Sequence, residues 1–186
     1  MAVLSGIAQI LMIKHCLSFQ PQNIIKLSDW DKAKFYYIFH GELYLLETFK
    51  SKLDKTKYNM EYLNDDFVKH ILALRENTIN CYDWEEIQVM TPSQTANLFG
   101  GATCYVYNSL PYTYAMFLKN PWSIETLYDT IAGGGDTDTN GSMCGAMLGA
   151  LNGTQIFPQH LIDGLWRKEE ILDTAERFCQ KFDITD

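Results

Sequence analysis

Basic residues are scarce in this chain, and those it has form no cluster. Lys and Arg total 15 against 23 Asp and Glu, which gives a formal net charge of −8. A protein that holds nucleic acid through its surface charge needs a basic patch, and an anionic membrane surface attracts the same kind of patch. We therefore expect neither a nucleic acid nor a membrane as a partner.

Cysteine pairs with metal-binding spacing are also missing. The five cysteines are odd in number and widely spaced, and none belongs to a CxxC pair, so a structural zinc site is not expected. Cysteines in mostly apolar contexts are typical of a reducing compartment, where thiols stay free. The sequence thus predicts a cytoplasmic protein with free, buried thiols at Cys16, Cys81, Cys104, Cys144 and Cys179.

Hydrophobic runs long enough to span a bilayer are lacking as well. Residues 2–13 are uncharged and mostly apolar, but a membrane-spanning helix needs about 20 such residues. No basic region precedes the run and no small-residue cleavage site follows it, so a secretory signal is not expected. The run predicts a core helix buried on nearly every side. Because so short a chain could hardly cover it, we also expect a segment to be missing before Met1.

The most informative segment is residues 132–141, with the sequence AGGGDTDTNG. Asp136 and Asp138 stand two positions apart, Thr139 follows them, and residues 133–135 are glycines. Carboxylates this close raise each other's pKa unless a cation lies between them. Carboxylate and hydroxyl oxygens are the ligands that hard divalent cations prefer, and glycines let the backbone turn tightly. The pattern predicts an oxygen-ligand metal site at the start of a helix.

The helix expected after this segment carries no charge and has a face of small residues. Gly141, Gly145 and Gly149 repeat every four residues, which places them on one side of a helix that another backbone could approach closely. Each glycine lowers helix propensity by about 1 kcal/mol, so tight packing must compensate. We therefore expect a buried helix in which a leucine at Gly145 would be overpacked.

Several structures compete for residues 133–147. A solvated turn explains the composition, and an EF-hand calcium loop matches Asp136, Asp138 and Asn140, but position twelve of that loop would be Met147 instead of glutamate. A phosphate-binding turn before a helix lacks the lysine of a Walker motif, and its aspartates would repel the phosphate. A magnesium site that helps to hold a charged substrate accommodates every residue of the segment.

The same residues resemble a known family. Residues 134–139, GGDTDT, followed by a Gly/Ala-rich helix and Asn152-Gly153, are similar to the C-terminal signature of the ADP-ribosylglycohydrolase family. Residues 104–118 resemble an earlier helix of that family, and residues 4–11 and 156–166 resemble other segments of it. The resemblance covers most of the chain, although the specific motifs lie within residues 100–166.

The resemblance implies an all-α, compact multi-helix bundle, with residues 1–186 forming a single domain that corresponds to the C-terminal part of the family fold. It implies Asp136 and Asp138 as catalytic carboxylates, and Asp136, Asp138 and Thr139 as magnesium ligands. Tyr105 and residues Gly133, Gly134 and Gly135 would bind the ADP-ribose part of the substrate. The implied reaction is magnesium-dependent hydrolysis of the bond that joins ADP-ribose to a modified protein or to a related conjugate.

The chain also departs from the family pattern. Family members are longer, and their N-terminal half supplies a glutamate and a Thr-Asp-Asp-Thr-like stretch that complete a site for two magnesium ions. Here Asp65 and Asp66 are the only adjacent aspartates, and they have the wrong flanks, so they are expected on the polar face of a helix. The missing ligands could come from a separate chain. Alternatively, the protein is a truncated, inactive module that binds ADP-ribose or a partner, or a helical domain that magnesium merely stabilises.

The remaining segments read mainly as helices. Residues 28–51 and a segment ending near Arg75 are expected to be helical, with a further helix start at residues 83–86. Residues 91–94 read TPSQ, a capping box with proline at the first helical position. Residues 102–119 have β-propensity but match a helix by resemblance. Ser123 is expected to cap a helix to about Thr130, Pro158 to start a short helix, and residues 168–182 to form the last one.

Overall fold

A computed structural model of the chain describes residues 2–17 and 84–181. Every regular element in these two ranges is a helix, and neither range contains a strand. The helices expected at 28–51 and before Arg75 lie outside the described residues, as do Asp65 and Asp66. The elements are α1 (Ala2–Leu17), α4 (Trp84–Val89), α5 (Pro92–Leu98), α6 (Val106–Lys119), α7 (Glu125–Ala132), α8 (Thr137–Asn152), the 3-10 helix η3 (Thr154–Ile156), α9 (Gln159–Asp163) and α10 (Lys168–Lys181).

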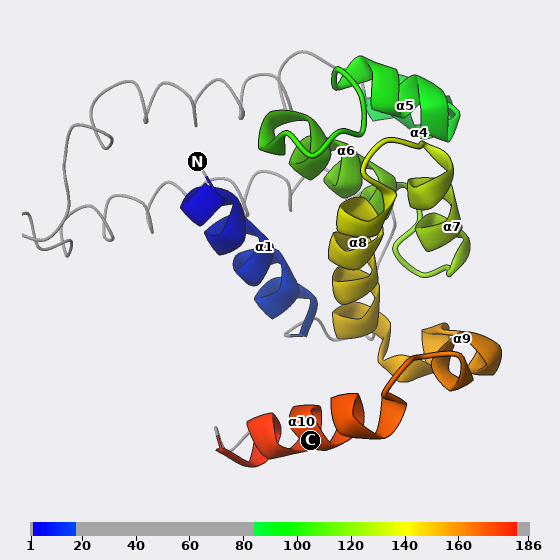
Figure 1. The fold of residues 1–186 in the computed structure, drawn as a ribbon. Coiled ribbons are helices and arrows are strands. Elements are labelled where there is room, and N and C mark those ends of the chain that lie inside the picture. Colours follow the sequence, from blue (N-terminus) through cyan, green and yellow to red (C-terminus); the bar gives the residue numbers. More distant parts are fainter. Residues whose placement is uncertain (1, 18–83, 182–186) are drawn as a thin grey trace, which may run out of the picture.

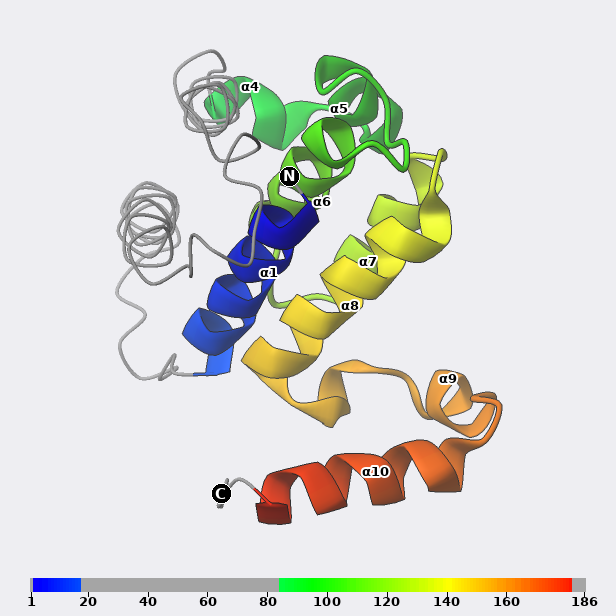
Figure 2. The same ribbon diagram turned by 60° about the vertical axis from the view of Figure 1, so that its left-hand side comes forward.

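Helix α8 lies at the centre of the described part and contacts α1, α6 and α7 (Figures 1 and 2). Its inward face is formed by Cys144, Met147, Leu148 and Leu151, whose spacing of three and four residues places them on one side of the helix. Met147 and Leu148 are fully buried, and burial of such a side chain contributes about 1.5–3 kcal/mol. The prediction of a buried helix after the signature is confirmed for this face.

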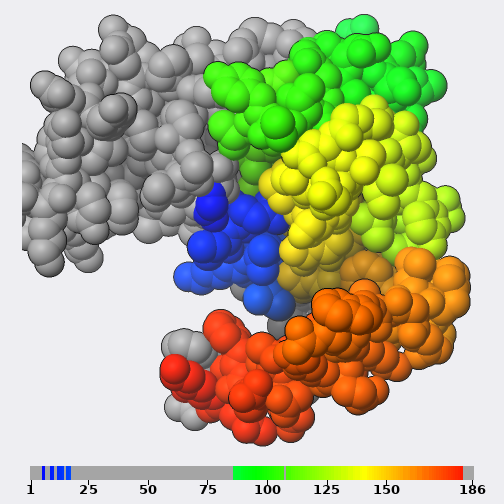
Figure 3. Space-filling model, in the orientation of Figure 1, coloured from blue at the N-terminus to red at the C-terminus, as the bar shows by residue number. Residues whose placement is uncertain are grey.

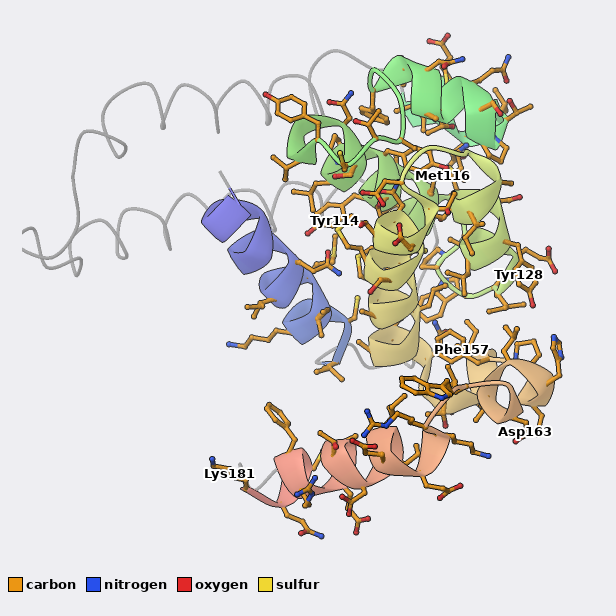
Figure 4. The ribbon with its side chains drawn as sticks, in the orientation of Figure 1. Tyr114, Met116, Tyr128, Phe157, Asp163 and Lys181 are labelled. Atoms are coloured by element: carbon orange, nitrogen blue, oxygen red, sulfur yellow. The ribbon has the colours of Figure 1, made fainter. Side chains whose placement is uncertain are left out.

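The glycines of α8 lie against side chains and not against a second backbone, which corrects the prediction. A Cβ atom at Gly149 would lie 3.3 Å from Cε2 of Phe157, the residue labelled beside the end of α8 in Figure 4. A Cβ atom at Gly145 would lie 3.9 Å from Cδ1 of Leu127, which is an ordinary van der Waals distance. The small-residue face therefore accepts side chains from α7 and from the segment after α8.

Residues 102–119, for which a strand and a helix were both considered, contain helix α6 and no strand. Residues 106–119 are helical, and residues 109–118 are all buried. The aromatic residues of this segment favour strands on propensity alone, but packing against α5, α7 and α8 outweighs that preference. Pro111 lies inside the helix, where it removes one backbone hydrogen bond, and the buried neighbours on both sides hold the helix together.

Helix α1 extends to Leu17, beyond the predicted end at residue 13. Met12 and Cys16 are buried, but Ile10 is 65% and Leu17 67% exposed, so burial on nearly every side is wrong for this helix. The reason is that α1 packs by one face on α8 and α6, where Gln9 donates from Nε2 to the carbonyl oxygen of Met143 at 3.1 Å. Within residues 2–17 and 84–181, no helix is long and apolar enough to cross a bilayer.

Two helix starts test the capping signals. The Thr91 hydroxyl accepts the N–H of Gln94 at 3.3 Å, and the Gln94 side chain accepts the N–H of Thr91 at 2.8 Å, so the predicted capping box is confirmed. Helix α7 begins at Glu125 with Ile124 as its N-cap residue, one position later than predicted. The Ser123 hydroxyl still accepts the N–H of Glu125 at 3.2 Å. The serine therefore marks the start of α7 to within one residue.

The C-terminal helices begin where the sequence predicts. Pro158 is the N-cap residue of α9, and α10 starts at Lys168. Figure 3 shows α10 along one margin of the molecule, and none of its residues is buried. The exposed large apolar side chains of this region are Leu161, Leu165, Trp166, Ile171, Leu172 and Phe178.

The cysteines match the prediction of buried free thiols only in part. Cys16 and Cys144 are free and buried, whereas Cys104 is exposed and Cys179 is half-buried, so burial was wrongly predicted for these two. The fifth cysteine lies outside the described residues. Burial raises the pKa of Cys144 to about 11, and the Thr130 hydroxyl donates to its sulfur at 3.4 Å. The Cys144 thiol is therefore neutral at physiological pH.

Candidate active site at the start of α8

The turn between α7 and α8 carries the predicted metal ligands. Asp136 is the N-cap residue of α8, and Asp138 lies in the first helical turn with Thr139 directly after it. Carboxylates at a helix N-terminus face the positive end of the helix dipole, which favours their charged form. The fold thus places Asp136, Asp138 and Thr139 together within one turn of helix.

The neighbouring residues Asp136 and Thr139 both act on the ionisation of Asp138. Hydrogen bonding with Asp136 is the largest cause that holds the pKa of Asp138 below its ordinary value. The backbone N–H of Thr139, which donates to Oδ1 of Asp138 at 3.0 Å, acts in the same direction. Asp136 makes no side-chain capping bond to the helix. Two aspartates at the start of a helix offer several carboxyl oxygens to a divalent cation.

The three glycines before Asp136 differ in their surroundings. A Cβ atom at Gly133 would overlap the Tyr112 hydroxyl, and one at Gly135 would overlap the carbonyl oxygen of Ala102. Gly135 and Gly134 also have φ values of +70° and +79°, which glycine adopts without strain. A Cβ atom at Gly134 would meet nothing within 4 Å. Packing thus explains Gly133 and Gly135, and Gly134 is the glycine whose backbone faces open space.

The carbonyl oxygen of Ala102 joins this turn to the loop that precedes α6. It accepts the N–H of Asp136 at 2.7 Å and Nδ2 of Asn140 at 2.9 Å. Three residues after Ala102, Tyr105 is the N-cap residue of α6, and its side chain is 59% exposed. Tyr105 and Asp136 therefore lie on two segments that are hydrogen-bonded to each other through Ala102.

Two buried polar residues behind the turn were missed by the sequence reasoning. Asn140 was considered only as a calcium ligand, but it is completely buried and its Oδ1 accepts the Thr113 hydroxyl at 3.1 Å. Since the chain is helical from Thr137 onward and Asn140 faces inward, the EF-hand interpretation is wrong. The available signal was periodicity, because Asn140 continues the inward face of Cys144.

The donor set can be tested for its fit to magnesium. Within the described ranges, no group of three or more His, Cys, Asp and Glu side chains gathers in a way that could hold a metal. Magnesium is commonly bound through one or two carboxylates, with water and substrate phosphates completing its coordination. Two carboxylates beside a hydroxyl at the start of α8 fit that mode. They do not provide an all-protein cage.

Comparison with known proteins identifies the family. The family model for ADP-ribosylglycohydrolase matches residues 2–185, which is essentially the whole chain. No curated protein and no solved structure matched. The helical architecture of the described residues agrees with the all-α fold of that family, so the predicted fold class is confirmed. The chain belongs to the ADP-ribosylglycohydrolase family, a family of hydrolases.

Proposed function

We propose that this chain hydrolyses ADP-ribose linkages with magnesium held by Asp136, Asp138 and Thr139. The observation that carries the proposal is the placement of Asp136 at the N-cap of α8, with Asp138 and Thr139 in its first turn. Family membership supports glycohydrolase-type hydrolysis in general, and the carboxylate pair supports a magnesium site as the means. When bound, magnesium supplies polarisation of a ribose oxygen and orientation of a water molecule.

The protein's own residues have distinct parts in this proposal. Asp136 and Asp138 provide the carboxyl oxygens that select a hard cation, and both lie at the N-terminal end of α8. The backbone at Gly134 lies open to a ligand, since no atom lies near the position of a side chain there. Tyr105 offers an exposed aromatic ring to the substrate from the neighbouring loop.

The substrate is an ADP-ribosylated protein or a related conjugate. The diphosphate of ADP-ribose would be repelled by the chain's net charge of −8 and by the aspartate pair in particular. A bound divalent cation reverses the local sign and so allows the anionic substrate to approach. A second magnesium ion would need ligands from outside the described residues, which a separate chain could supply.

The experiment that tests the function measures release of free ADP-ribose from ADP-ribosylated proteins. Purified chain is incubated with magnesium, with a chelator, and as the Asp136→Ala/Asp138→Ala double variant. Asp163→Ala is the matched control, since this exposed aspartate lies on α9, beyond the far end of α8 (Figure 4). Release that requires magnesium and both signature aspartates, but not Asp163, supports the proposal, whereas release that survives the double variant contradicts it.

A binding module without hydrolytic activity is the second candidate. It is favoured by the finding that, among the residues the structure describes, no third acidic or histidine ligand joins Asp136 and Asp138. Such a module would bind ADP-ribose without releasing it from a modified protein. Calorimetric titration with ADP-ribose, run beside the release assay, separates the two candidates, because saturable binding without release is the expected result for the module only.

A further inference from the structure

Asn140 is the polar residue on the otherwise apolar inward face of α8. The side chains that continue this face are Cys144, Met147, Leu148 and Leu151, whereas Asn140 is an amide with no exposed surface. A buried amide without partners costs about 1–3 kcal/mol, so its position there requires hydrogen bonds. Both Oδ1 and Nδ2 of the Asn140 side chain make hydrogen bonds.

The chemistry of the two partners fixes the orientation of this amide. The carbonyl oxygen of Ala102 can only accept, so the Nδ2 group of Asn140 must face it, at 2.9 Å. Oδ1 then faces the Thr113 hydroxyl, which donates to it at 3.1 Å. Thr113 is also completely buried, so neither bond competes with solvent. The Ala102 carbonyl thus determines which way the Asn140 amide points, and the Thr113 hydroxyl holds its other end.

These bonds hold three segments at one point beside the aspartate pair. Thr113 belongs to α6, Ala102 to the loop before α6, and Asn140 to the first turns of α8. The Ala102 oxygen that binds Asn140 also accepts the N–H of Asp136 at 2.7 Å. Asp136 is therefore anchored to the same acceptor that Asn140 holds in place.

We propose that Asn140 is a positioning residue for the magnesium site, held at its Oδ1 end by Thr113 and acting on Asp136 through the Ala102 carbonyl. It sets where the Asp136 main chain enters α8, and with it the distance between the two carboxylates that receive the cation. This inference rests on the proposed magnesium-dependent function. It assigns Asn140 and Thr113 no contact with metal or substrate.

The test compares variants of Thr113 and Asn140 in their affinity for magnesium alone, measured by calorimetric titration. Thr113→Val keeps the shape but removes the hydroxyl, and Thr113→Ser keeps the hydroxyl. Removing a partner that orients a metal ligand lowers metal affinity by about 10-fold or more, so Thr113→Val and Asn140→Ala should bind magnesium about 10-fold more weakly. Thr113→Ser should stay within about twofold of the unmodified chain, as should Ser142→Ala, an exposed substitution on the same helix.

Unfolding by urea is measured on the same variants, at a temperature where each is fully folded. If Thr113 only stabilises the fold, Thr113→Val will have a lower free energy of unfolding but the same magnesium affinity as Thr113→Ser. That result would overturn the inference. If Asn140→Ala does not fold, comparing Thr113→Val with Thr113→Ser still shows whether the hydrogen bond to Asn140 affects magnesium affinity. If the unmodified chain binds no magnesium, both this inference and the proposed metal site fail. Magnesium binding that is unchanged in Thr113→Val overturns the positioning role alone.

Discussion

The hydroxyl group of Tyr112 occupies the space beside Gly133 in which a Cβ atom would have to lie. The same hydroxyl donates to the carbonyl oxygen of Thr130 at 2.8 Å, and Tyr112 has no exposed surface. One phenol group of α6 therefore contacts both the last turn of α7 and Gly133, the first of the three glycines before Asp136. The position of the turn that precedes Asp136 depends on this contact.

Replacing Gly133 by alanine is expected to lower the free energy of unfolding by about 1–3 kcal/mol, the usual cost of overpacking a filled site. The backbone at Gly133 has a φ of −64°, which any residue adopts, so the cause is the overlap with Tyr112 and not backbone strain. Urea unfolding followed by circular dichroism measures the change.

The control for this prediction is the same substitution in a Tyr112→Phe background. Removing the hydroxyl relieves the closest overlap, so the cost of Gly133→Ala should fall there, and the difference is the coupling between the two residues. An equal cost in both backgrounds would show that the Tyr112 hydroxyl is not the cause, since the ring carbons of residue 112 remain in Tyr112→Phe.

Tyr112 should also make the protein sensitive to alkaline pH. Burial is the largest cause that raises the pKa of Tyr112 to about 12, followed by the proximity of Cys144 and Asp129. Because this folded-state pKa lies above the unfolded value of about 10, its stabilisation is complete below about pH 10 and is lost as pH rises toward about 12. The loss is at most about 1.4 kcal/mol per pH unit.

The measurement is the urea unfolding free energy at a series of pH values through this range. Tyr112→Phe has no group to ionise at this position, so its stability should fall less steeply with pH than that of the unmodified chain. Cys144, with its pKa raised to about 11, contributes a slope of the same sign, which a Cys144→Ala variant removes separately. Parallel slopes for the unmodified chain and Tyr112→Phe would contradict the prediction.

Local signals in the sequence predicted most of the described helices. The capping box at Thr91, the proline before α9 and the start of α10 each depend on residues close together in the chain, so their outcome needs no knowledge of the fold. The uncharged segment after the signature also predicted a helix with a buried face. The prediction that α1 is buried on nearly every side was wrong because an apolar composition does not reveal which face contacts α8.

The arrangement behind the candidate site could not be predicted in the same way. Asn140 is 38 residues from Ala102 and 27 from Thr113 along the chain, and only the packing of α6 on α8 brings them into contact. Residue type indicates that Asn140 can donate and accept, but not which atoms it meets. The aspartate pair was predictable because its members are two residues apart. The hydrogen bonds that support it join residues far apart in the chain, so they depend on the tertiary fold.

Asp138→Ala is expected to abolish any thermal shift that magnesium causes in the unmodified chain. The cation would lose one of the two carboxylates at the start of α8, and a single carboxylate with a hydroxyl binds a hard cation weakly. Differential scanning fluorimetry with and without magnesium measures the shift. Asp163→Ala serves as the comparison and should keep the shift, since Asp163 accepts hydrogen bonds from Gln159 on α9 and Lys168 on α10. A shift that persists in Asp138→Ala would mean that magnesium binds elsewhere.

Gly145→Ala should stabilise the protein, whereas Gly149→Ala should not. Both positions lie inside α8, where alanine is favoured over glycine by about 1 kcal/mol through helix propensity. At Gly145 the added Cβ atom would lie 3.9 Å from Leu127, so the propensity gain is retained in full. At Gly149 it would lie 3.3 Å from the ring of Phe157, and moving that ring is expected to offset the gain. Urea unfolding of the two variants side by side measures the difference, and an equal gain in both would show that the Phe157 ring yields without cost.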